Sequence, residues 1–166
     1  MALASLYNLP VNIRQTAATA ANATVFAMRN DVNSTVLISI ERIELLLAFD
    51  TATPLTRATP RYDLVRFSTA TPTGGTALSV QRAYSGDPAS QIADARFLDT
   101  GLTTTNVVFN PAFATIGCPA TDATTTHYTR QGISIYLGPG EGFCIRLNTA
   151  AIIGQSLVGE IIWSER

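Results

Sequence analysis

The stretch that decides the fold is Gly132–Leu147, GISIYLGPGEGFCIRL. On both sides of its central GPGEG, apolar and polar residues alternate with a period of two, which is the pattern of a β-strand with one buried face. The apolar positions are Ile133, Ile135, Leu137, Phe143, Ile145 and Leu147. The segment therefore predicts two strands joined by a tight corner.

The glycine-rich corner, Gly138–Gly142, could also be a phosphate-binding loop. Such a loop needs a strand before it and a helix after it, so that the helix N-terminus faces the anion. Here the following run is a second strand, the glycine spacing matches neither the dinucleotide nor the Walker pattern, and the chain has no lysine. Proline presets φ for a turn and glycine permits a positive φ, so we predict a hairpin corner.

A second run of alternation, Val36–Leu47, changes phase midway. The apolar positions are Val36, Ile38 and Ile40 in one phase, and Ile43, Leu45 and Leu47 in the other. Because a strand has a period of two, a change of phase requires an extra residue or a bend. We therefore predict a β-bulge near Glu41–Arg42.

Weaker strand patterns fill most of the remaining chain, separated by Thr, Pro, Gly, Asn and Asp. They cover Val11–Gln15, Thr24–Arg29, Leu64–Thr69, Ala77–Arg82, Arg96–Leu98 and Val107–Phe109. A clear alternation over Leu157–Ser164 predicts a further strand near the C-terminus. Ser90–Ala95 is expected to form one helical turn. Many short strands with turn signals between them predict an all-β protein, with two packed antiparallel sheets or a closed barrel. For the sandwich, the inward faces should include Ile38, Ile40, Leu45, Leu47, Ile135, Phe143, Ile145, Leu147 and Ile161.

Length, charge and hydropathy restrict the kind of protein. The 166 residues suffice for one hydrophobic core, so we expect a single domain over residues 1–166. Charged residues make up 14% of the chain and the net charge is −1, which gives no electrostatic basis for binding nucleic acid. The apolar run at Leu45–Phe49 is far shorter than the roughly 20 residues that span a bilayer. Met1–Leu6 also lacks the features of a secretory signal. We expect neither a nucleic-acid nor a membrane partner.

The residues that usually perform catalysis are sparse and poorly placed. His127 is the one histidine, and we interpret it as a surface residue. Gly154–Gly159, GQSLVG, places its second glycine one residue too late for a G-x-S-x-G nucleophile motif. Neither a C-x-x-C pair nor an acidic calcium loop is present. Cys118 and Cys144 are expected to be free thiols. We therefore predict a non-enzymatic protein with no catalytic residues, cofactor or metal.

Two C-terminal segments resemble a known kind of domain. GISIYLGPGEGFCIRL, followed by GQSLVGEIIWSE at Gly154–Glu165, is similar to the closing strands of small jelly-roll domains. Trimeric domains of the C1q and tumour-necrosis-factor type close in a similar way. The small jelly-roll decoration, or cement, proteins of tailed-bacteriophage heads are the nearer resemblance. The resemblance implies a jelly-roll sandwich and carries over no catalytic residue.

The resemblance also implies a function and a location. It predicts a virion structural protein on the outer surface of a phage capsid, which decorates and stabilises the shell by bridging major capsid protein subunits. A homotrimer is expected, and its candidate contacts are Arg42, Tyr136 and Arg146. Residues 1–12 form a candidate contact arm, kept extended by Pro10, with the alternative that they form a first strand packed on the core. The candidate arm contacts are Leu3, Leu6, Tyr7, Leu9 and Val11.

A second function is also compatible with this sequence. A jelly roll can serve as a carbohydrate-binding module of a phage tail or receptor-binding tip. Such a site needs an exposed aromatic side chain with polar neighbours. The one aromatic candidate is Tyr128, beside His127 and Arg130, and Tyr62 and Tyr84 lie elsewhere in the sequence.

Overall fold

A computed structural model describes residues 5–14, 19–49, 61–117, 126–150 and 155–166. The described residues form twelve strands and no helix. The strands are β1 (Ser5–Arg14), β2 (Thr24–Asn30), β3 (Ile38–Phe49), β4 (Arg61–Thr69), β5 (Thr76–Ala77), β6 (Gln81–Arg82), β7 (Ile92–Leu102), β8 (Val107–Phe109), β9 (Ala114–Gly117), β10 (Thr126–Leu137), β11 (Gly142–Leu147) and β12 (Gln155–Glu165).

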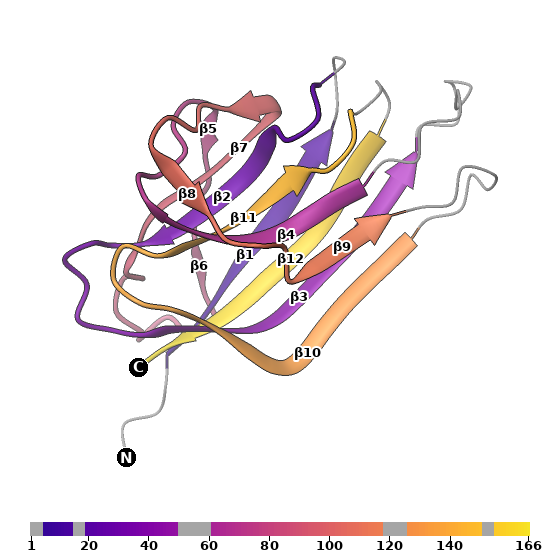
Figure 1. Cartoon of the computed structure of the whole chain (residues 1–166). Coiled ribbons are helices and arrows are strands. Elements are labelled where there is room, and N and C mark those ends of the chain that lie inside the picture. The colour runs from indigo at the N-terminus through magenta and orange to yellow at the C-terminus, as the bar shows by residue number, and fades with distance from the viewer. Residues whose placement is uncertain (1–4, 15–18, 50–60, 118–125, 151–154) are drawn as a thin grey trace.

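The strands form two antiparallel sheets that pack face to face (Figure 1). The first sheet has the order β10-β3-β12-β1-β6. The second has the order β5-β7-β2-β11-β4-β8, and β9 also pairs with β4. The predicted all-β sandwich is therefore confirmed. The expected helical turn at Ser90–Ala95 is wrong, because residues 92–95 belong to β7 and pair with β2.

The strand order is that of a jelly roll. Along the chain, β1, β3, β10 and β12 lie in the first sheet, and β2, β4 and β11 lie between them in the second. Each sheet therefore combines strands from the beginning and the end of the chain, as in β1-β12-β3-β10 and β2-β11-β4-β8. Two interlocked Greek keys have this arrangement. The short β5 and β6 and the longer β7 are additions at the sheet edges.

The space between the sheets is filled by the residues that the alternation predicted. All nine residues expected on the inward faces are buried in one core, and the most exposed of them, Ile135, is only 7% exposed. The predicted bulge is also confirmed. In the pairing of β3 with β12, Arg42 faces Ile162 and Ile40 faces Trp163, so Glu41 is the extra residue.

The glycine-rich corner is a turn, but it does not close a hairpin. The Glu141 N–H donates to the Gly138 carbonyl at 3.0 Å, and Gly140 has a φ of +77°, as in a type II turn with Pro139 at its second position. The strands that it joins lie in different sheets, β10 in the first and β11 in the second. The corner therefore carries the chain across the sandwich.

The N-terminal segment is a core strand over its described residues. Residues 5–14 pair with β12 along their whole length, and Tyr7, Leu9 and Val11 are at most 1% exposed. The contact-arm prediction is therefore wrong for these three residues, and the first-strand alternative is correct. Leu6 remains exposed, whereas Leu3 lies outside the described residues.

Pro10 fits this strand because of the direction in which its backbone points. The Leu6 carbonyl accepts a hydrogen bond from the Ala83 N–H, on the side of β1 that faces β6. Backbone groups alternate in direction along a strand, so the nitrogen of Pro10 faces the same side, away from β12. A proline without an N–H is tolerated at such an edge.

The outer face of the second sheet has a small core of its own. Ala27, Val65, Phe67, Leu102 and Cys144 are buried there beneath Leu98, Val107 and Phe109. Cys144 is a free thiol, whereas Cys118 lies outside the described residues. Among the described residues, no helix has the length and apolar character to cross a membrane.

The burial of Cys144 predicts how slowly it reacts. Desolvation by burial raises the pKa of this thiol far above its ordinary value, and the thiolate is the reactive form. We expect iodoacetamide at pH 8 to leave Cys144 unmodified in the native protein and to alkylate both cysteines in non-reducing denaturant. Peptide mapping by mass spectrometry distinguishes the two sites. Rapid native labelling of Cys144, or a Cys118–Cys144 bridge in the denatured sample, would contradict this expectation.

Candidate functional site

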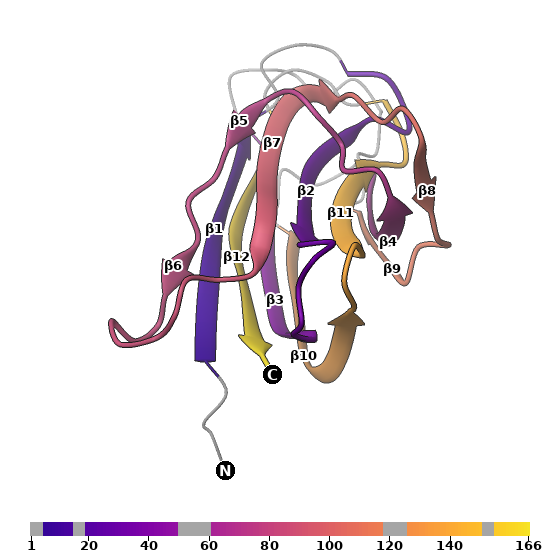
Figure 2. The same ribbon diagram turned by 90° about the vertical axis from the view of Figure 1, so that its left-hand side faces the viewer.

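Large exposed apolar side chains gather at one end of the sandwich. They are Leu6, Val32, Leu37, Tyr84 and Tyr136, and we call the surface that carries them the apolar end. Figure 2 shows the connections β2–β3, β6–β7 and β10–β11 at this end, together with the C-terminus. The remaining large exposed apolar residues of the described chain are Val108 and Val158, on β8 and β12.

Backbone hydrogen bonds tie the segments of the apolar end together. The Asp31 N–H donates to the Gln91 carbonyl at 2.9 Å, which joins the β2–β3 connection to the segment before β7. Leu37 and Arg166 exchange two such bonds, at 2.9 and 3.1 Å. The Gly140 N–H donates to the Asp31 carbonyl at 3.3 Å. The exposed side chains are therefore held on a connected backbone frame.

The carboxylate of Glu165 fastens the segment that carries Tyr84. It accepts hydrogen bonds from the Ser90 hydroxyl at 2.5 Å, the Gln91 N–H at 3.0 Å and the Trp163 Nε1–H at 3.2 Å. These contacts tie the end of β12 to the segment that leads into β7. Glu165 is only 9% exposed, and a carboxylate is costly to bury without such donors, so the network explains why this residue is tolerated there.

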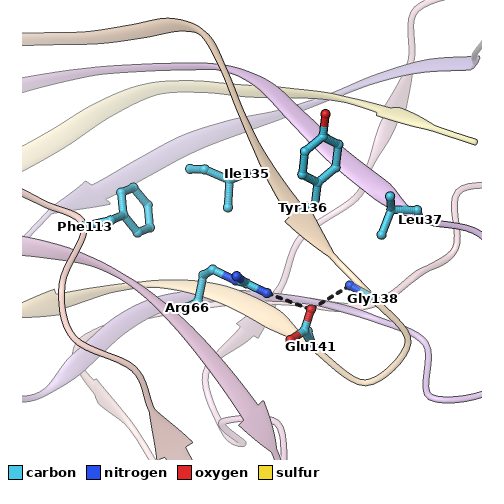
Figure 3. A pocket seen from close by; sticks show the side chains of 7 residues that line it. All are labelled: Leu37, Arg66, Phe113, Ile135, Tyr136, Gly138 and Glu141. Carbon is cyan, nitrogen blue, oxygen red and sulfur yellow. Dashed lines mark hydrogen bonds and ion pairs between the residues drawn. The ribbon is translucent and has the colours of Figure 1, made fainter.

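A hollow of about 340 Å³ opens beside the apolar end (Figure 3). It lies where the edge strand β10 of the first sheet faces β4 of the second. Its lining residues are Leu37, Arg66, Phe113, Ile135, Tyr136, Gly138 and Glu141. In the view of Figure 3, the four apolar side chains lie along one side and the Arg66–Glu141 pair along the other. The hollow therefore combines an apolar wall with a polar one.

The polar wall is built by β4 and the glycine-rich corner. Arg66 has the same parity along β4 as the core residues Tyr62 and Leu64, so its side chain starts toward the first sheet. Its Nη2 donates to Glu141 Oε2 at 2.8 Å, and the same oxygen accepts the Gly138 N–H at 2.8 Å. The corner therefore fixes the acidic partner of Arg66.

The three candidate trimer contacts do not form one patch. Tyr136 lines the hollow. Arg42 pairs with Glu44 and, at 2.9 Å, with Glu160 on the outer face of the first sheet. Arg146 lies over the Phe109 ring, 4.1 Å from its centroid, on the outer face of the second sheet. An interface that included all three would need two different faces of each subunit, as in a cyclic head-to-tail trimer.

A second hollow, of about 440 Å³, lies on the outer face of the first sheet. Arg42, Glu44 and Glu160 form its charged part, and its other lining residues are Pro10, Leu46, Val158 and Gly159. The charged groups already pair with one another. The charges that line this hollow therefore neutralise one another in large part, and we assign no ligand to it.

The structure shows which of the residues considered for catalysis or sugar binding are buried and which are exposed. Tyr62 is fully buried and so is excluded as a glycan platform. Tyr84 is 70% exposed and is therefore a candidate platform in the structure. The side chains of His127, Tyr128 and Arg130 lie outside those described. Across the described parts of the chain, no three His, Cys, Asp or Glu side chains come together as a metal site would require.

Sequence reasoning missed several members of the site. Leu37, Arg66 and Phe113 come from three separate segments, and nothing in their local sequence brings them together. The glutamate of the corner was one available signal, because a Gly-Pro-Gly-Glu turn can return its carboxylate to its own first N–H.

Comparisons with known proteins give no relative for this chain: no protein-family model matches it, and neither does a curated sequence or a solved structure.

Proposed function

We propose that this chain is a non-enzymatic structural protein of a tailed-phage virion. It decorates the outer surface of the capsid and stabilises the shell by bridging major capsid protein subunits, which it contacts through the apolar end. The observation that carries this proposal is the gathering of five exposed apolar side chains on one hydrogen-bonded frame. A concentration of large exposed apolar side chains on one part of a surface commonly marks a protein-contact site.

The fold and the composition support the same proposal. The jelly-roll strand order is the one implied by the resemblance of the C-terminal segments to phage decoration proteins. Because one fold serves many functions, this agreement is secondary to the apolar end. A surface with few charged residues is also suited to desolvation in a contact. Binding the assembled shell, and not its separated subunits, then stabilises the shell by mass action.

The proposal includes a homotrimer. A cyclic trimer uses two different patches on each subunit, and the positions of Arg42 and Arg146 on opposite outer faces are compatible with that arrangement. Tyr136 then belongs to the shell contact of the apolar end and not to the trimer contact.

A single charge in the apolar end should weaken attachment to the shell. Leu37 is 42% exposed and lines the hollow with Glu141. In Leu37→Asp, a second carboxylate beside Glu141 would have to be desolvated, so we expect attachment to weaken at least about tenfold. The measurement uses heads that lack this protein, to which wild type or variant is added back, with occupancy and the temperature of genome release as readouts.

The matched control is Val108→Asp, which makes the same kind of change at an exposed position on β8, away from the apolar end. It should bind like the wild type. Absence of wild-type binding, with no gain in release temperature, would reject the cement function. Equal binding by both variants would reject only the apolar end as the contact. Deleting residues 1–10 is not a suitable test, because it removes residues 5–10 of β1 from the sheet.

A carbohydrate-binding module is the second candidate function. The exposed ring of Tyr84 favours carbohydrate binding. The ring lies close to Gly86, because a Cβ added at Gly86 would come within 2.7 Å of a ring carbon. An exposed ring of this kind presents a flat platform, on which a sugar could stack. Specific binding on a glycan array that is lost in Tyr84→Ala would promote this function over the first.

A further inference from the structure

The lining and the volume of the hollow at the apolar end indicate which chemical group it could bind. Its apolar wall consists of Leu37, Phe113, Ile135 and Tyr136. Its volume of about 340 Å³ lies at the lower limit of the range for small-molecule pockets. That size and lining suit one apolar side chain better than an extended ligand.

The polar wall has hydrogen-bond donors that the protein does not use. The one hydrogen bond of the Arg66 side chain in the described structure goes from Nη2 to Glu141, and the buried Nε has no partner there. A guanidinium carries five N–H donors, and 36% of the Arg66 side chain is exposed. An acceptor that enters the hollow can therefore bond to the guanidinium without displacing Glu141.

The pairing of Arg66 with Glu141 selects the charge of that acceptor. The pair is formally neutral, so the hollow offers a hydrogen bond without a net positive charge. A carboxylate that approached Arg66 would also approach Glu141 and be repelled. An uncharged carbonyl meets no such repulsion.

The position of the hollow suggests where a carbonyl and an apolar side chain would come from together. Ile135 and Tyr136 belong to β10, which pairs only with β3 in the described structure and is the edge strand of its sheet. Extended peptides bind at such edges, where their backbone makes hydrogen bonds and alternate side chains enter pockets. By contrast, the opposite edge of the sheet is formed by the short β6, which covers part of β1, and the uncovered part of β1 carries Pro10.

We propose that the hollow receives one apolar side chain from an extended segment of a partner protein, and that an uncharged peptide carbonyl of this segment accepts a hydrogen bond from Arg66. The identity of the partner, the major capsid protein, rests on the proposed function. The chemistry of the segment rests on the hollow alone.

A pair of small probes tests this chemistry without the partner. N-acetyl-leucine methylamide carries the apolar side chain and only uncharged carbonyls, whereas N-acetyl-leucine carries the same side chain and a carboxylate at pH 7. Titration of ¹⁵N-labelled protein should shift the amide signals of Ile135, Gly138 and Glu141 with the methylamide. The carboxylate probe should bind at least about tenfold more weakly.

Two variants extend the test. In Glu141→Gln the carboxylate is gone while the side chain keeps an oxygen for the Gly138 N–H, so the carboxylate probe should bind as well as the methylamide or better. Leu37→Ala should weaken both probes, and Val108→Ala should weaken neither. Dispersed amide spectra establish that each variant is folded.

The outcomes separate this inference from the proposed function. Absence of shifts around the hollow with the methylamide, or equal binding of both probes by the wild type, would overturn the inference. If wild-type protein still attached to heads, the cement function would remain. Selective methylamide binding with no attachment to heads would support the hollow and reject the capsid as its partner.

Discussion

Replacing Gly159 with alanine is expected to lower the free energy of unfolding by about 3 kcal/mol or more, at the upper end of what overpacking costs. Gly159 lies in β12, the middle strand of the first sheet, between Leu45 on β3 and Val11 on β1. An added Cβ would stand 1.9 Å from the Glu44 carbonyl oxygen and 2.8 Å from its carbon. Both are backbone atoms of a paired strand, so relief requires the two strands to separate.

Gly138→Ala is the matched control for this substitution. The nearest atom to its added Cβ is a carboxylate oxygen of Glu141 at 3.4 Å, at the far end of a flexible side chain, and Gly138 does not have a positive φ. We expect a change of less than about 1 kcal/mol there. Urea unfolding followed by circular dichroism measures both variants. A Gly159→Ala protein as stable as the control would show that β3 and β12 are not in such close backbone contact.

The parts of the fold that follow from the alternation of apolar and polar residues along a strand could be predicted from the sequence. Alternation identified the inward residues of β3, β10, β11 and β12, and its change of phase located the bulge at Glu41. The same signal is present in β1, where Tyr7, Leu9, Val11 and Ile13 alternate with Asn8, Pro10 and Asn12. The sequence left an arm and a first strand open as alternatives, because Pro10 keeps the segment extended in either case.

The errors arise where local sequence does not specify the partner. Residues 90–95, SQIADA, contain helix formers, and only pairing with β2 makes the segment from Ile92 a strand. The corner at Gly138–Glu141 has the same turn chemistry whether its flanking strands pair or cross between sheets. Alternation with a period of two identifies a strand but not the sheet to which it belongs. A hairpin and a connection that crosses from one sheet to the other therefore look alike in sequence.

The candidate site was hidden for the same reason. Leu37 and Tyr136 have ordinary positions beside or within predicted strands, and Arg66 interrupts an apolar run on β4. The jelly-roll order places β10 opposite β4, and this alone brings the three residues to one hollow. Inward-facing parity on β4 was the available signal for Arg66, because a charged residue at a core-facing position calls for a partner.

The second large effect is expected at Trp163, the one tryptophan of the chain. Its side chain is fully buried, stacks on Tyr7 with ring centroids 5.8 Å apart, and donates its Nε1–H to Glu165 at 3.2 Å. Trp163→Ala leaves a cavity beside Tyr7 and removes one donor from the buried Glu165 carboxylate. We expect a loss of about 3–5 kcal/mol in the free energy of unfolding.

Two further variants separate the contributions at this position. Trp163→Phe keeps a ring against Tyr7 but cannot donate to Glu165, so its loss should be intermediate. Ile162→Ala changes the adjacent residue, which is half-buried on the outer face of the same strand, and should cost about 1 kcal/mol. Circular dichroism in urea serves all three, because the variants at 163 lack the fluorophore. If Trp163→Ala cost no more than Ile162→Ala, the packing of β12 onto the core at the apolar end would be refuted, and with it the rigid frame on which the docking proposal depends.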